Sequence, residues 1–370
     1  MTKLLAFGIM SLTLESELSY FTEIAMLAES CGMEVFRFIP SHINPHSLHV
    51  KGKKFDSKRK AWVSAEFPIP SILYDRCFYG EDEHSKQCLP IVSWLKNQKD
   101  ITFLGYGLPN KLELYHVLKN TPLSPYLPPT QHVQDAKTVI KELAQKKKVI
   151  LKPIGGAHGY GIYSLKKNDK TFLVKTEKQK QMVSRIFPNE AKLHKWLESL
   201  ITKRQYLIQP YLELVTNELE PFDIRMLLQK DEFGNWGELG RGIRVGNSGG
   251  ILSNLSAGGT CKPFSEWISK LPKTKAEYIT EELDYILSEL PHLLENAFLP
   301  LFELGVDIGI AQNGSIWILD LNSKPGRKVL LQTRPDLKDT LHMRPLLYGK
   351  YLSQLEHLER KNTYEKTLSH

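Results

Sequence analysis

Two aspartates and an asparagine near the C-terminal end of the sequence can be placed on one face of a β-hairpin. Asn313-Gly314 separates two alternating apolar runs, VDIGIAQ and SIWILDLN, which is typical of a type I′ hairpin turn. If Gln312 pairs with Ser315, one face of the hairpin has Asp307 directly opposite Asp320, followed by Asn322. The other face then has the apolar residues Ile308, Ile310, Trp317 and Leu319.

This pairing predicts a metal site. Directly opposed carboxylates repel each other unless a cation neutralises them. Two carboxylates and an amide oxygen are oxygen ligands of the kind that Mg²⁺ accepts. The sequence therefore predicts that Asp307, Asp320 and Asn322 bind magnesium, and an arginine that bridges the two aspartates is the alternative.

A glycine-rich segment, KPIGGAHGYGI at residues 152–162, follows a short apolar run. Glycines let backbone N–H groups wrap phosphate oxygens that a Cβ atom would exclude, and a lysine at the strand end adds a positive charge. The segment is neither a Walker A sequence nor a strand-to-helix GxGxxG, and alone it also fits a plain hairpin turn. The predicted phosphate-binding residues are Lys152, Gly155, Gly156, His158, Gly159 and Gly161, with a surface role as the alternative for the histidine.

Arginines and a second glycine-rich segment supply candidates for substrate binding. In FDIRMLL, Asp223 and Arg225 share one face of a strand, and Arg241 and Arg244 follow on the neighbouring strand. Guanidinium groups suit phosphate or carboxylate recognition, although each arginine singly also fits a surface ion pair. The segment NSGGILSNLSAGGT adds Asn254, Gly258 and Gly259, and an ordinary loop is the alternative there.

The elements that position these residues follow from periodicity. Residues 3–39 predict strand, helix and strand, and PIPSILYD and ITFLGYG add two strands, so an open α/β domain is expected at residues 1–107. Asp135 can cap a helix before the strand VILKPI, and YLIQPYL predicts a strand that is at an edge or ends at Pro210. FDIRMLLQK and WGELGRGIRVG predict an antiparallel pair, and residues 276–299 a helix broken or kinked at Pro291.

These elements suggest a second domain at residues 108–350 and a polar tail at residues 351–370. Within the second domain we expect a nucleotide-clamping subdomain at about 130–212 and a metal and substrate subdomain at about 213–350. A length of 370 residues agrees with two or three packed units, because single cores rarely grow that large.

Composition excludes several classes of protein. No apolar run approaches the ~20 residues that span a bilayer, and no signal peptide is recognisable, so a cytoplasmic protein is expected. The four cysteines are scattered without a CxxC spacing, which argues against zinc, disulfides and redox chemistry.

The net charge of +8 fits nucleic acid, a membrane surface or an anionic substrate. The basic runs at 51–60 and 146–148 lack interleaved aromatic residues, so we interpret them as solvated faces and nucleic acid as an unlikely partner.

Taken in order, KPIGGAHGYGI, YLIQPYL, FDIRMLL, GRGIRVG, SNLSAGG and VDIGI…WILDLNSKPG resemble the ATP-grasp superfamily, in particular its YheC/YheD-like, endospore coat-associated branch. The resemblance implies a preATP-grasp open α/β domain followed by an ATP-grasp fold of two α+β subdomains. It also implies that Lys111 and Lys152 contact the nucleotide and that Asp307, Asp320 and Asn322 hold Mg²⁺. Adenine would contact the main chain of Gln209, Pro210, Tyr211 and Leu212. Many family members have glutamate where Asp320 stands, which leaves the number of metal ions open.

The function that the resemblance implies is ATP-dependent ligation of a carboxylate to an amine through an acylphosphate. ATP and one or two Mg²⁺ ions, or Mn²⁺, would be the cofactors, and Arg225 and Arg244 would assist catalysis. The partners would be an anionic carboxylate donor, such as an amino acid or acidic peptide, and an amine acceptor. Two alternatives stay open: a spore-coat assembly protein that binds ATP without turnover, and a basic nucleic-acid-binding module.

Overall fold

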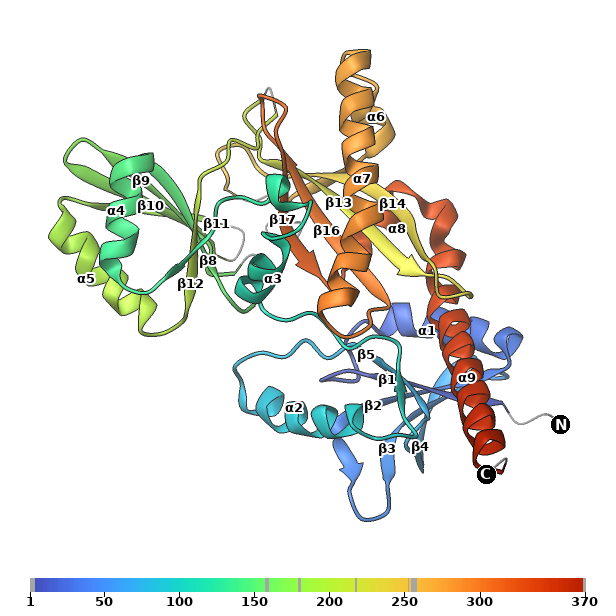
Figure 1. Cartoon of the computed structure of the whole chain (residues 1–370). Coiled ribbons are helices and arrows are strands. Elements are labelled where there is room, and N and C mark those ends of the chain that lie inside the picture. Colours follow the sequence, from blue (N-terminus) through green and yellow to red (C-terminus); the bar gives the residue numbers. More distant parts are fainter. Residues whose placement is uncertain are drawn as a thin grey trace.

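Three β-sheets organise the chain (Figure 1). The computed structural model describes residues 4–156, 160–178, 181–216, 218–251, 253 and 258–368. Within these ranges, no helix is both long enough and apolar enough to cross a bilayer.

The first sheet has the strand order β4-β3-β2-β1-β5-β6 and forms the α/β unit expected from the sequence. Its central strands are parallel, whereas β2, β3 and β4 form an antiparallel meander. The basic run at 51–60 lies in β3 and the turn after it, and neither β3 nor β4 was predicted. The elements are β1 (Leu5–Met10), α1 (Leu18–Ala28), β2 (Met33–Asn44), β3 (His49–Asp56), β4 (Ala61–Pro68), β5 (Ile72–Asp75), α2 (Glu83–Lys96) and β6 (Thr102–Phe103).

The second sheet has the order β11-β10-β9-β8-β12-β7, and all of its pairs are antiparallel. Two helices, α4 and α5, pack on one face around a core that includes Leu143, Leu151 and Leu197. Asp135 caps α4 as predicted, since its carboxylate accepts the N–H of Thr138 at 2.7 Å. The elements are β7 (Gln131–Val133), α4 (Ala136–Lys146), β8 (Lys148–Pro153), β9 (Tyr163–Asn168), β10 (Thr171–Lys178), β11 (Gln181–Phe187), α5 (Glu190–Ile201) and β12 (Tyr206–Pro210). The helix before them, α3 (Lys111–Leu118), contributes Leu114 and Leu118 to the core of the third sheet.

The third sheet has the order β15-β14-β13-β16-β17, and α7 covers one of its faces. Ile279, Leu283, Ile286 and Leu290 recur at helical spacing and are buried against the sheet. The sequence predicted a break or a kink at Pro291; the break is absent, since α7 continues through this proline to Ala297. The elements are β13 (Phe222–Lys230), β14 (Trp236–Val245), β15 (Thr260–Pro263), α6 (Phe264–Ile268), α7 (Lys273–Ala297), β16 (Glu303–Ile310) and β17 (Ile316–Asn322).

The β16–β17 hairpin pairs Asp307 with Asp320, as predicted, but its turn differs from the prediction. Ala311 donates its N–H to the carbonyl of Ser315 at 2.9 Å, and Gly314 has a φ of 89°, so the turn is a three-residue loop and not a type I′ turn. The strands therefore start one residue out of the predicted register, and a bulge after Asp307 restores it.

The bulge changes the face of two side chains. The core contains Ile316 and Ile318 beside Ile308 and Ile310, so the prediction that Trp317 and Leu319 lie on that apolar face is wrong.

The C-terminal elements, α8 (Lys328–Thr333) and α9 (Lys338–Leu368), return to the first sheet. α9 packs beside α1, as Figure 1 shows, and contributes Leu341, Leu346 and Tyr348 to a core shared with Phe7 and Phe21. The first and third sheets therefore form one packed body, although they are far apart in the sequence.

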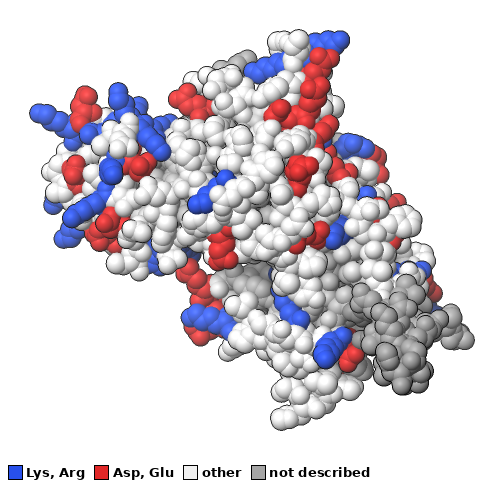
Figure 2. All heavy atoms as spheres, viewed as in Figure 1, with Lys and Arg blue, Asp and Glu red and all other residues white. Residues whose placement is uncertain are grey.

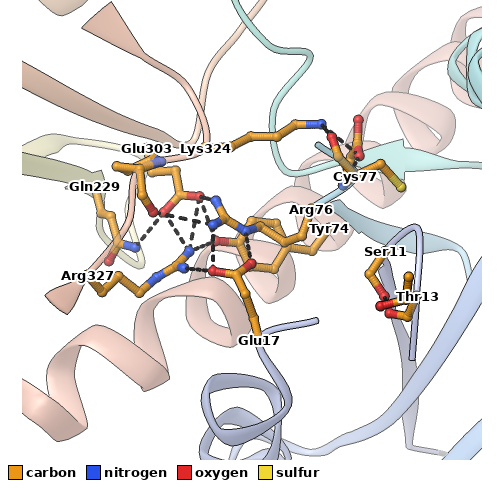
Figure 3. Close-up of polar contacts among 12 residues, drawn as sticks. Ser11, Thr13, Glu17, Tyr74, Arg76, Cys77, Gln229, Glu303, Lys324 and Arg327 are labelled. Carbon is orange, nitrogen blue, oxygen red and sulfur yellow. Dashed lines mark hydrogen bonds and ion pairs between the residues drawn. The ribbon is translucent and has the colours of Figure 1, made fainter. Parts of the chain in front are cut away.

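A buried ion cluster joins the same two sheets (Figure 3). Glu303, 2% exposed, accepts hydrogen bonds from Arg76 and Tyr74 at 2.7 Å each, from Gln229 at 3.1 Å and from Arg327 at 3.2 Å. Glu17 accepts two further bonds from Arg76 at 2.8 Å and one from Arg327 at 2.9 Å. We call these residues the Glu303 cluster.

Candidate active site

A cleft between the second and third sheets collects most of the predicted site residues. It encloses about 1020 Å³ of empty space, part of it open to solvent, and both apolar and charged side chains line it. A lining of apolar side chains with a few charged groups is the composition expected of a ligand site. The predicted residues that line it are Lys111, Lys152, Gly156, Gln209, Pro210, Tyr211, Leu212, Asp223, Arg244, Asp307 and Asp320.

Two lysines approach the carboxylate hairpin from different elements. Asn110 caps α3 by accepting the N–H groups of Leu112 and Glu113 at 3.0 and 3.1 Å, so that Lys111 is the first helical residue and forms an ion pair with Asp320. Lys152, on β8, lies 3.4 Å from the carbonyl of Leu319. The pKa of Lys152 is lowered to about 8, mainly by burial; the charge of Asp320 opposes this shift and the positive charge of Lys111 adds to it.

Asp307 lies between two arginines on neighbouring strands. Arg225 donates to both of its oxygens, one bond being 2.9 Å, and Arg244 contacts Oδ2 at 2.9 Å. Arg244 also donates two 2.6 Å bonds to Asp223, which accepts the hydroxyl of Ser253 at 2.5 Å. Burial alone would raise the pKa of Asp307, but the two arginine charges outweigh it and hold that pKa below its usual value.

The two aspartates therefore have separate cations. Arg225 and Arg244 neutralise Asp307, and Lys111 neutralises Asp320. The expectation of an unrelieved repulsion between the aspartates is wrong, and in the described part of the chain no single arginine bridges them. Asp223 likewise has the buried Arg244 as its partner.

The donor set still fits a divalent cation. A carboxylate has about four acceptor positions. The contacts above use three positions on Asp307 and one on Asp320, so both can accept another ligand. Asn322 pairs with Gly305 two residues beyond Asp320 and adds an amide on the same strand. Among the described residues, no group of three or more His, Cys, Asp or Glu forms a metal site, so the proposed site depends on the amide.

The apolar end of the cleft suits a flat aromatic ring. Gln209 to Leu212 lie along one side, where Gln209 donates to Thr130 at 2.7 Å and the Lys148 ammonium lies 3.3 Å from the Tyr211 ring centroid. The sequence predicted that Pro210 lies on an edge strand or at a strand end. β12 is an internal strand and Pro210 is its last residue, so the second alternative is observed.

Several predicted residues lie elsewhere. Arg241 was expected near Arg244, but residues three apart on a strand point to opposite faces, and Arg241 pairs with Glu238 and Asp284 away from the cleft. Arg225 does not line the cleft itself, and its link to the cleft is the hydrogen bonds that it donates to Asp307. The other predicted residues that do not line the cleft are Gly155, Gly161, Gly258, Gly259 and Asn322. His158, Gly159 and Asn254 lie outside the described residues.

The cleft is also lined by residues that were not predicted from the sequence, among them Ile150, Tyr160, Ser253 and Leu319. Ile150 was detectable, because it lies two residues before Lys152 on the same strand and therefore on the same face. Leu319 was assigned to the wrong face because the bulge was not foreseen. Nothing in the sequence marks Ser253 as a site residue except its position in a glycine-rich segment.

The comparisons with known proteins agree with this geometry. A family described as "YheC/D like ATP-grasp" matches residues 100–352. Endospore coat-associated protein YheC of Bacillus subtilis (strain 168) is 37% identical over 350 residues, covering 94% of this chain and 96% of that protein. Endospore coat-associated protein YheD of the same organism is 26% identical over 339 residues, covering 90% of this chain and 74% of that protein.

Solved structures show the same fold at low sequence identity. D-alanyl-alanine synthetase A from Vibrio cholerae superposes with a TM-score of 0.55 at 12% identity, covering 95% of this chain and all of that one. The D-alanine-D-alanine ligase from Coxiella burnetii gives a TM-score of 0.50 at 11% identity, covering 99% of this chain and all of that one. The α/β architecture is thus that of ATP-grasp ligases, and the chain belongs to the YheC/D-like ATP-grasp family.

Proposed function

We propose that the protein is a Mg²⁺-dependent ligase that activates a carboxylate with ATP and joins it to an amine. The family and the fold support an ATP-dependent, ligase-type enzyme, and the reaction is the finer proposal. The observation that carries it is one cleft in which Lys111, Lys152, Gly156 and the segment from Gln209 to Leu212 lie around Asp307 and Asp320 of the β16–β17 hairpin.

Charge supports a triphosphate in this cleft. Lys111, Lys152, Arg225 and Arg244 contribute four positive charges, and Asp223, Asp307 and Asp320 contribute three negative ones. The surplus is positive before any metal binds, which favours a polyanionic ligand. Mg²⁺, held by Asp320, Asn322 and the remaining acceptor position of Asp307, would neutralise phosphate charge when bound.

The proposed reaction has two steps. A carboxylate oxygen attacks the γ-phosphorus, and the bond from that phosphorus to the bridging oxygen of ADP breaks, which gives an acylphosphate and ADP. The amine nitrogen then attacks the carbonyl carbon, the bond from carbon to the phosphate oxygen breaks, and the amine proton passes to solvent. The chain's part is to position the reactants and to neutralise charge, through Lys111, Lys152 and the N–H groups of Arg244 not used by aspartates, while Arg225 acts by holding Asp307.

A second candidate is a spore-coat assembly protein that binds ATP without turnover. It is favoured by the names of the two Bacillus subtilis relatives and by the ion pairs that Asp320 and Asp307 make with Lys111 and Arg225.

ADP release across a panel of amino acids and acidic peptides, each with and without an amine acceptor, separates the two candidates. We expect an anionic donor to stimulate ADP release, and the melting temperature to rise with MgATP, since a ligand at a hundredfold excess over Kd stabilises the fold by about 2.7 kcal/mol. Lys152→Ala should reduce this rise, whereas Arg241→Gln, outside the cleft, should not. A full rise without turnover on any donor would favour the assembly protein.

A further inference from the structure

Positive charge is concentrated on the second sheet and its helices. Residues 130–212 contain 17 of the 49 Lys and Arg but six of the 41 Asp and Glu, a net charge of +11. Because the whole chain has +8, the rest of the protein has −3. Figure 2 shows Lys and Arg gathered over this lobe, at the left of the view. Such an asymmetric field attracts an anionic partner to this lobe in particular.

The lobe also ends in an open strand. β11 is the last strand in its sheet, so its outer edge has no partner strand in the described part of the chain. Six of its seven residues are exposed, and only Phe187 is buried. Three of the exposed residues are large and apolar, at 38%, 44% and 68% exposure: Met182, Val183 and Ile186.

An edge of this kind is suited to an added strand. Unpaired N–H and C=O groups bind an extended peptide by main-chain hydrogen bonds, and the side chains beside them select its sequence. Alternation places Met182 and Ile186 on one face and Val183 and Arg185 on the other, so Arg185 is the charged residue of its face. A segment in which acidic and apolar residues alternate would therefore set its apolar side chains beside Ile186 and its carboxylates beside Arg185.

Protection against aggregation and binding of nucleic acid both fit this edge less well. On some edge strands, basic residues have no role other than to prevent aggregation. β11 does not fit this explanation, because it has one basic residue and three exposed apolar ones. A single-stranded nucleic acid would need exposed aromatic rings to stack on. Phe187 of β11 is buried in the lobe's core, and its ring packs against that of Trp196 with the centroids 5.5 Å apart and the planes tilted by 42°.

We propose that the outer edge of β11 is a docking site for an extended, acidic polypeptide segment of alternating acidic and apolar residues. This goes beyond the proposed ligase function and does not require turnover, so the two can fail separately. An acidic chain held on this edge would lie on the lobe that also lines the ATP cleft.

The test is binding of fluorescent 12-residue peptides to the full-length protein. One peptide alternates Glu and Val, a second has the same composition in two blocks, and a third alternates Lys and Val. We expect the first to bind most tightly and to protect amides of Gln181–Phe187 from hydrogen exchange. Arg185→Glu should weaken it roughly fivefold or more, because an attractive cross-strand pair becomes repulsive. Lys273→Glu, the same charge change on the distant α7, should have little effect.

Three results would overturn the proposal: equal binding of the block peptide, equal weakening by Arg185→Glu and Lys273→Glu, or no amide protection in β11. Tighter binding of a single-stranded oligonucleotide that protects the same amides would also overturn it and would assign the edge to nucleic acid. The exchange measurement on the unmodified protein needs no variant, so a folding defect in Arg185→Glu leaves the test intact. The rise in melting temperature with MgATP, measured in parallel, reports on the proposed function independently.

Discussion

β16 contains two carboxylates, Glu303 and Asp307. Each of them lies between two arginines, but different parts of the molecule cover them. Glu303 is covered by the first sheet, which brings Arg76 and Tyr74, and by Arg327. Asp307 faces the cleft, where Arg225 and Arg244 hold it and the second sheet supplies Lys152.

A carboxylate between two arginines can thus serve structure or ligand binding. A buried charge must be paired, since an unpaired one costs several kcal/mol. In the Glu303 cluster, groups from two sheets complete the pairing, so the ions couple the two sheets. Asp307 and Asp320 line the open cleft, so under the proposed function phosphate and a metal would exchange with the contacts that these carboxylates make to arginine and lysine.

The largest expected effect is a loss of stability when the Glu303 cluster is disrupted. Glu303→Gln keeps the shape but leaves Arg76 and Arg327 with Glu17 as their shared carboxylate, so we expect a loss of about 3–5 kcal/mol in the free energy of unfolding. Glu266→Gln, which removes an exposed pair with Lys270, should change the free energy of unfolding very little, because solvent screens such a pair. Chemical denaturation of both variants measures the difference, and equal losses would show that the cluster does not couple the sheets.

The next largest effect is a difference in stability and turnover between variants of Asp307 and Asp320, two aspartates that line the cleft. Asp307→Asn leaves two buried arginines without their shared carboxylate and should cost about 3 kcal/mol of stability. Asp320→Asn removes a partly exposed pair and should cost about 1 kcal/mol or less, yet reduce Mg²⁺-dependent ATP turnover roughly 100-fold.

Asp320→Glu is the matched control, because it keeps the carboxylate and should retain substantial activity. Melting curves without metal and ADP release titrated with Mg²⁺ test all three variants. Unchanged turnover in Asp320→Asn would remove this residue from the metal site.

The smallest effect is a pH dependence of nucleotide affinity. Burial lowers the pKa of Lys152 to about 8, so its ammonium is present at pH 7 and is lost as the pH rises through 8. ATP affinity should therefore fall above pH 8, by at most about tenfold per pH unit, and ATP binding at pH 8.5 should take up protons. Lys152→Arg stays charged and should remove this dependence. Calorimetric titration at pH 7, 8 and 9 in two buffers measures both quantities, and an unchanged affinity in the parent would mean that Lys152 does not contact phosphate.

Much of the site was already determined by the sequence. Asn313-Gly314 between alternating runs located the hairpin, and the two aspartates met as predicted because the bulge after Asp307 offset the one-residue difference at the turn. Asp135 capped its helix because a carboxylate there accepts a free N–H group. These features depend on local backbone geometry, which neighbouring residues control.

Only the tertiary structure decided which cations meet which carboxylates. Lys111 and Asp320 are 209 residues apart, Arg76 and Glu303 are 227 apart, and nothing local signals such pairs. The bulge after Asp307 moved Leu319 into the cleft, and α9 completed the core of the first sheet, because burial of apolar surface is satisfied by whichever element packs there. Periodicity determines which face of an element is apolar or charged, and the packing of distant elements determines what that face contacts.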